Sequence, residues 1–165
     1  MGAGGGGREP EVGDVSVRPK RIVHVVDADY VEVRACVDRD LGRSAGSEST
    51  GLCHVTVAPG KEGAPLHCHS AEEEMFVILE GGGTVYLGEE QEAVRAGHVL
   101  GRPPGTGISH SFRAGDEGMT YLAYGTRDTN DIAYYPRSNK VNFRGIKLIG
   151  RIERLDYWDG EPGPE

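Results

Sequence analysis

The sequence is short of the residues that mark several classes of protein. Its three cysteines, Cys36, Cys53 and Cys68, include no CxxC pair. An odd number of cysteines at irregular spacing argues against a disulfide framework and favours reduced thiols. No apolar run approaches the roughly 18 residues that cross a bilayer. We therefore expect no membrane-spanning segment and no membrane partner.

Basic charge is also scarce. The chain has 18 lysines and arginines against 26 acidic residues, a net charge of −8. This balance argues against nucleic acid or an anionic membrane surface as a partner. The opening stretch MGAGGGGREPEVGD has neither the basic start nor the apolar segment of a secretory signal. We expect a cytoplasmic protein.

Glycine, by contrast, is abundant, with 26 glycines and nine prolines in 165 residues. The glycine share is about twice the usual 7 %, which indicates many turns and few long helices. Residues 1–18 offer little to bury and are predicted to be a flexible tail. Residues 19–160 then form one domain, a size that fits the chain, and residues 161–165 form a C-terminal tail.

The remaining pattern is that of short strands. Apolar residues do not recur at helical spacing over three turns, and roughly ten strand-like segments lie between turn residues. Residues 21–26, RIVHVV, form one such segment. Residues 51–59, GLCHVTVAP, alternate in character, and residues 74–81, EMFVILEG, predict a strand buried on both faces. Together these segments predict an all-β sandwich or barrel.

One segment, PLHCHSAEEEMFVILEGGG, carries candidate metal ligands. His67 and His69 alternate, so on a strand both imidazoles point to one face, roughly 6.7 Å apart. Two imidazoles and one carboxylate make a face that holds a metal and leaves positions open. Glu74 begins the apolar run and is the carboxylate expected to point inward, whereas Glu72 and Glu73 are expected in a solvated turn.

Taken alone, this segment supports a second interpretation. A His-x-His pair occurs by chance, and three successive glutamates are usually a charged turn in water. A later element favours the metal site, because AGHVLGRPPGTGISHSF combines a glycine-bounded strand, a Pro-Pro-Gly turn and His110. An antiparallel neighbour in a barrel can bring His110 to the same interior face. The proposed ligand set is then His67, His69, Glu74 and His110.

These residues resemble the cupins, a family of small β-barrels defined by two motifs. The first corresponds here to His67, His69, Glu74 and Gly81, and the second to Gly97, Pro103 and His110. The resemblance implies a double-stranded β-helix that holds one divalent transition metal, with Fe(II), Mn(II), Ni(II), Co(II) and Zn(II) all suited to three imidazoles and a carboxylate.

The resemblance also implies a range of functions. We expect a metal-dependent enzyme that acts on a small oxygenated or carboxylated molecule, with a dioxygenase first and an isomerase, lyase or cyclase next. The alternative is a cupin that binds a small metabolite or sugar without turnover. Cupins often pair, so a homodimer is expected.

Several further residues are candidates at such a site. Glu74 could act as a base when it loosens from the metal. Arg102 would suit an anionic substrate. The roles of His98 and His54 in lining the site stay open. The other expected substrate contacts are Phe76, Tyr86, Phe112 and Tyr121.

Overall fold

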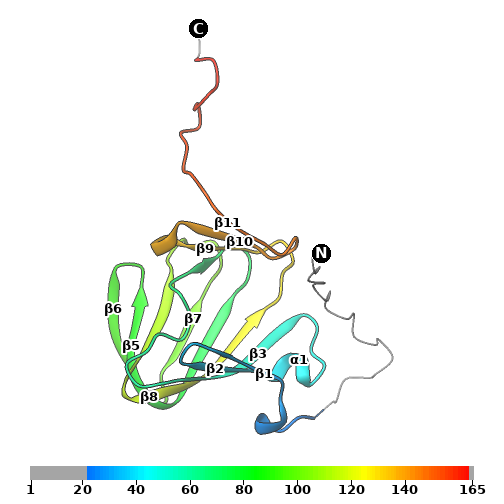
Figure 1. The fold of residues 1–165 in the computed structure, drawn as a ribbon, viewed down its shortest axis with the longest axis vertical. Helices are drawn as coiled ribbons and strands as arrows, with labels where there is room; N and C mark the ends of the chain where they lie inside the picture. Colours follow the sequence, from blue (N-terminus) through cyan, green and yellow to red (C-terminus); the bar gives the residue numbers. More distant parts are fainter. Residues whose placement is uncertain (1–21, 164–165) are drawn as a thin grey trace, which may run out of the picture.

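The computed structural model describes residues 22–163 of the chain (Figure 1). The expected tail at residues 1–18 lies outside this range, as do residues 164–165 of the expected C-terminal tail. The elements in chain order are η1 (Val25–Asp27), β1 (Tyr30–Val33), β2 (Cys36–Asp40), α1 (Leu41–Ser44), β3 (Thr50–Val57), β4 (Cys68–His69), β5 (Glu74–Leu87), β6 (Glu90–Arg95), β7 (Val99–Arg102), β8 (His110–Thr126), β9 (Ile132–Tyr135), η2 (Pro136–Ser138), β10 (Lys140–Phe143) and β11 (Leu148–Arg151).

The strands form two antiparallel sheets. The larger sheet has the order β1-β2-β3-β8-β5-β6, and β7 also pairs with β5. The smaller sheet has the order β11-β10-β9-β4 and lies across one end of the larger one (Figure 1). The all-β prediction is therefore confirmed. No helix in residues 22–163 is long and apolar enough to cross a membrane.

Two strands are much longer than the sequence predicts. β5 and β8 continue through glycine clusters, which we expected to be turns, at residues 81–83 and 115–118. The pairing register shifts at Gly81–Gly83, so this cluster makes a β-bulge. Gly81 has φ +66°, and a Cβ on it would lie 2.2 Å from the Gly118 carbonyl oxygen. Glycine therefore lets the two long strands approach closely, and it does not end them.

The hydrophobic core is formed by inward-pointing side chains of the larger sheet. Val55 and Val57 of β3 point inward, as their alternation predicts, and they pack with buried side chains of β5 and β8. β5 is buried on one face only, because Phe76 and Ile78 are buried whereas Met75 is 46 % exposed. The expectation of burial on both faces was therefore wrong.

Three strands carry too weak a pattern to be predicted, and one predicted strand is absent. The sequence did not indicate β1, β2 and β11, whereas β4 lies where His67 and His69 were placed on a strand. The described part of residues 21–26 contains no strand and ends in the 3-10 turn η1. His24 caps this turn, because its Nδ1 accepts a hydrogen bond from the Val26 N–H at 3.4 Å. A polar side chain at a turn start competes with strand pairing, which hydropathy alone does not detect.

Candidate metal centre

The backbone brings two of the proposed ligands side by side. His67 and His110 form an isolated antiparallel bridge, in which His67 N–H donates to the His110 carbonyl at 3.1 Å and His110 N–H donates to the His67 carbonyl at 2.7 Å. Such paired residues project to the same face of a sheet. Their imidazole centroids accordingly lie 4.7 Å apart. His69 follows on β4, and its ring centroid lies 5.0 Å from that of His67.

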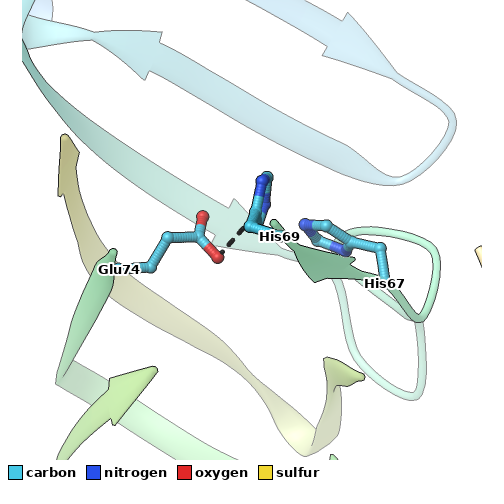
Figure 2. Close-up of side chains that lie close together, drawn as sticks. All are labelled: His67, His69 and Glu74. Carbon is cyan, nitrogen blue, oxygen red and sulfur yellow. Dashed lines mark ion pairs between the residues drawn. The ribbon is translucent and has the colours of Figure 1, made fainter. Parts of the chain in front are cut away.

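Glu74 completes the group from the first position of β5. It shares the inward parity of Phe76 and Ile78, so its carboxylate points into the barrel. Its Oε2 lies 3.0 Å from His110 Nε2 and 3.4 Å from His69 Nε2. Figure 2 shows Glu74 directed towards His69, with His67 alongside. Candidate ligand atoms of His67, His69 and Glu74 all lie within 4.8 Å of one another.

Hydrogen bonds on the far side of the rings orient two of these histidines. His67 Nδ1 lies 2.7 Å from the Pro65 carbonyl oxygen, and His69 Nδ1 lies 2.7 Å from Asp131 Oδ2. Because both partners only accept, each Nδ1 carries the proton and each Nε2 presents a lone pair to the centre. Three atoms of the group are buried without a hydrogen-bond partner in the described residues: His69 Nε2, His110 Nε2 and Glu74 Oε2.

The protonation states of His67 and Glu74 suit a cation. Burial, and next the neighbouring His110, lower the pKa of His67 from 6.5 to about 4, so this imidazole is neutral at pH 7. Burial alone would raise the pKa of Glu74, but contact with His110 and proximity to His69 and His67 hold it below its usual range. Neutral imidazoles and an ionised carboxylate are the forms that bind metal.

A second buried group lies behind His69, and it corrects one expectation. Glu72 was expected in a solvated turn, yet it is only 6 % exposed. Its Oε1 accepts the Asp128 N–H at 3.1 Å, and its Oε2 lies 2.8 Å from Arg144 Nη2. Burial raises the pKa of Glu72, and the charge of Arg144 opposes this effect. Glu73 alone fits the expected exposed turn.

Of the expected substrate contacts, Arg102 borders the centre directly. It pairs with Glu74 across β7 and β5, and its Nη2 donates to the Ile108 carbonyl at 2.7 Å. Its Nε is buried without a partner in the described part of the chain. Arg102 lines a narrow recess together with His69, Glu74 and His110. The Arg102 side chain therefore borders the centre at this recess.

The aromatic candidates lie mostly beneath the centre. The Phe76 ring is 5.2 Å from that of His110 and packs against Phe112 and Tyr121, all three within the hydrophobic core. They form an apolar floor under the ligand group. Tyr86 differs, because it neighbours the inward Val85 and its ring lies 5.4 Å from the Arg137 guanidinium carbon.

The two histidines that the sequence left open lie away from the centre. His98 is exposed and lines a separate, mainly apolar cavity of about 470 Å³ between β5, β6 and β7. His54 sits between inward-facing residues of β3, on the opposite face of the sheet. Neither is among the residues that border the ligand group.

A cavity of about 520 Å³ opens beside Glu74. Its lining is strongly charged and includes residues that sequence reasoning did not single out. Arg127 donates to both carboxylate oxygens of Asp40 at 3.1 and 3.2 Å. Gly125 faces Glu74 across the strand pair and leaves space for its side chain. The charged residues of the lining are Asp40, Arg43, Glu48, Glu72, Glu74, Arg127, Asp128 and Arg144.

Comparisons with known proteins agree with this fold. The Cupin domain family matches residues 53–124, which include all four proposed ligands. Auxin-binding protein 1 of Arabidopsis thaliana is 44 % identical over 64 residues. That match covers 36 % of this chain and only 29 % of the relative, so the chain spans less than a third of that protein.

Two solved structures extend the similarity over more of the chain. A putative sugar phosphate isomerase from Acidithiobacillus ferrooxidans is 28 % identical, with a TM-score of 0.64 over 73 % of this chain and 81 % of that one. A sugar phosphate isomerase of the cupin superfamily from Silicibacter pomeroyi is 23 % identical, with a TM-score of 0.67 over 90 % of this chain and 88 % of that one. The second likeness concerns the fold alone.

Proposed function

Because the Cupin domain family matches residues 53–124 of this chain, we propose that His67, His69, Glu74 and His110 bind one divalent transition metal. One observation carries this proposal: His69 Nε2, His110 Nε2 and Glu74 Oε2 converge, buried and without hydrogen bonds in the described residues. Buried polar atoms normally have a hydrogen-bond partner, so three such atoms without one indicate that a further group binds at this point. Three imidazoles and one carboxylate fit Fe(II), Mn(II), Ni(II), Co(II) or Zn(II).

The protein is proposed to be an enzyme for a small, carboxylated or hydroxylated molecule. A bound ion supplies a Lewis acid with open positions for substrate oxygens. The cavity beside Glu74 has room for a metabolite, and its charged lining suits polar groups. Arg102, whose Nε has no partner among residues 22–163, would bind an anionic group at the centre.

Proton transfer is the step that the residues themselves can perform. The Glu74 carboxylate is ionised at neutral pH and borders both the ligand group and the cavity. It can take a proton from a carbon or oxygen of the substrate and return it at a neighbouring atom. The similarity to a putative sugar phosphate isomerase supports this class of reaction. A dioxygenase, which we placed first from the sequence, is the second candidate, since the same ligand set suits iron.

Metal content is the first test. The protein is purified without a metal-chelating column and analysed for bound metal beside the His67→Ala and Glu74→Ala variants. We expect about one ion per chain in the wild-type protein and a loss in both variants. A wild-type protein that is metal-free and takes up none of the five ions would refute the proposal.

Activity assays separate the reaction classes. The loaded protein is supplied with phosphorylated sugars, and conversion to isomers is followed by NMR in D₂O, where proton transfer through Glu74 introduces deuterium. Oxygen uptake with small carboxylic and hydroxy acids tests the dioxygenase. Saturable binding of these compounds without conversion in either assay would support the alternative of a binding module. Light scattering in solution tests the expected homodimer.

A further inference from the structure

Asp131 is a buried carboxylate that no part of the proposed reaction uses. It lies just before β9, is 1 % exposed, and reaches the loop that carries the ligands. Its Oδ1 accepts the backbone N–H groups of Ser70, Ala71 and Glu72 at 3.0, 3.0 and 3.2 Å. Its Oδ2 lies 2.7 Å from His69 Nδ1. One side chain thus ties together His69 and the chain that leads to Glu74.

This arrangement constrains the proton on His69. Three backbone N–H groups donate to Oδ1 and favour the charged form of the carboxylate, so Oδ2 is an acceptor for His69 Nδ1. His69 must therefore donate through Nδ1, and its Nε2 must present a lone pair to the centre. We propose that Asp131 is a positioning residue that fixes the tautomer and orientation of His69 for metal binding. This inference rests on the proposed metal site.

The alternative, that His69, Glu72 and Asp131 are themselves a second metal site, fits the charges less well. Candidate ligand atoms of the three lie within 4.8 Å of one another. Arg144, however, already places a guanidinium 2.8 Å from Glu72 Oε2 and 3.5 Å from Asp131 Oδ2. A cation at this point would meet a fixed positive charge. In addition, one His69 ring cannot use Nδ1 both as a donor to Asp131 and as a ligand.

The variant Asp131→Asn tests the tautomer with almost no change in shape. An amide has one acceptor and one donor end. With its oxygen on the three backbone N–H groups, its NH₂ must face His69 and donate to Nδ1. The proton of His69 then moves to Nε2, the atom that faces the centre. The reversed amide would direct its NH₂ at three backbone donors, which a buried group does not tolerate.

The first readout is the tautomer of His69 in the metal-free protein at pH 8. Long-range ¹H–¹⁵N NMR spectra distinguish the two neutral forms, and single His→Gln variants assign the rings. We expect Nδ1–H in the wild-type protein and Nε2–H in Asp131→Asn. A wild-type His69 in the Nε2–H form would overturn the proposal, and this measurement stands even if the variant does not fold.

The second readout is metal affinity, titrated with Co(II) by visible absorption. Loss of an outer partner of a metal-binding histidine typically costs about 10–100-fold in affinity, and we expect this weakening in Asp131→Asn. The matched control is Asp116→Asn, an exposed position on β8 away from the centre. Equal Co(II) affinity in a folded Asp131→Asn and the wild-type protein would overturn the proposal.

The two readouts also separate this inference from the proposed function. A wild-type protein that binds neither Co(II) nor the other four ions, yet shows the tautomer exchange on Asp131→Asn, contradicts the metal site and still supports the orientation of His69 by Asp131. A protein that binds Co(II) with no change of tautomer in the variant keeps the metal site and removes Asp131 from it.

Discussion

His110 Nε2 and Glu74 Oε2 lie 3.0 Å apart at the start of the two longest strands, β8 and β5. Apart from this close approach, neither atom has a hydrogen-bond partner in the described residues. The strands β5 and β8 pair along most of their length, with Glu74 opposite Gly125 and His110 opposite Leu87, so each residue is anchored at one end of the same ladder. The centre is therefore built on rigid elements, which suits a site whose ligand geometry must be held closely.

The carboxylate of this pair gives the first prediction. Glu74→Gln keeps the shape but removes the anionic ligand. We expect a fall in Co(II) affinity larger than the ~10–100-fold typical of changes in outer partners. Calorimetric titration measures it. The neighbouring Glu73→Gln is the matched control, since Glu73 is exposed and should leave affinity unchanged. Equal losses in both variants would contradict the inward placement of Glu74 as the cause.

The sequence predicts the centre better than it predicts the strands around it. Alternation in His67 and His69 and the position of Glu74 before an apolar run are local signals, and the structure brings these residues together. The role of His110 could be predicted because glycines and prolines flank its strand. The bulge at Gly81 could not be predicted, because a glycine cluster has the same composition in a turn and in a bulge.

Local sequence patterns could not predict which residues hold the metal-binding side chains in place. Asp131 reaches His69 across 62 positions of the sequence, and Arg144 reaches Glu72 from beyond β10. Neither contact produces a periodic pattern in the sequence. The prediction that Glu72 is solvated failed for this reason, since nothing near it in the sequence indicates that an arginine will neutralise it. The direction of side chains such as Asp40 on β2 could not be predicted either, because the sequence did not indicate that strand.

The buried imidazole of His67 predicts the pH dependence of the metal-free protein. Its pKa is about 4 in the fold against 6.5 unfolded, so between these values the unfolded chain binds the extra proton. Above pH 6.5 His67 does not lower the free energy of unfolding, and this free energy decreases as the pH falls towards 4. His110 drives this shift further and Glu74 opposes it. Urea unfolding between pH 7.5 and 4 measures the effect.

A His67→Gln variant should show a flatter dependence over this range, because glutamine does not titrate. His98→Gln, at an exposed position, should keep the wild-type dependence. Parallel curves for the His67→Gln variant and the wild-type protein would show that His67 is not the group responsible.

Gly81 gives a prediction about the fold. Gly81→Ala places a side chain at φ +66° and 2.2 Å from the Gly118 carbonyl oxygen. We expect a loss of about 2 kcal/mol or more in the free energy of unfolding, from backbone strain and the steric clash together. Gly101→Ala is the control, because no atom lies within 4 Å of its added Cβ. Thermal unfolding followed by circular dichroism compares them, and a neutral Gly81→Ala would refute the steric role of this glycine.

Arg144 gives the last prediction. Glu72 is buried, and burial raises its pKa while Arg144 opposes that rise. Arg144→Gln should therefore raise the pKa of Glu72 further and make its ionised form more costly in the fold. Below the unfolded glutamate pKa of about 4.3, Glu72 is protonated in both states and the loss of stability should be small. As the pH rises above that value, the unfolded chain releases the proton first, so the deficit relative to wild type should grow.

Chemical unfolding of both proteins at pH 4 and pH 8 measures this difference. Arg95→Gln on β6 is the matched control, since Arg95 is exposed and forms no ion pair within the described chain. A deficit of equal size at both pH values would mean that Arg144 acts by packing its side chain or through Asp131, because neither contribution depends on the charge of Glu72. A deficit confined to pH 8 would show that Arg144 stabilises the fold through the buried carboxylate of Glu72.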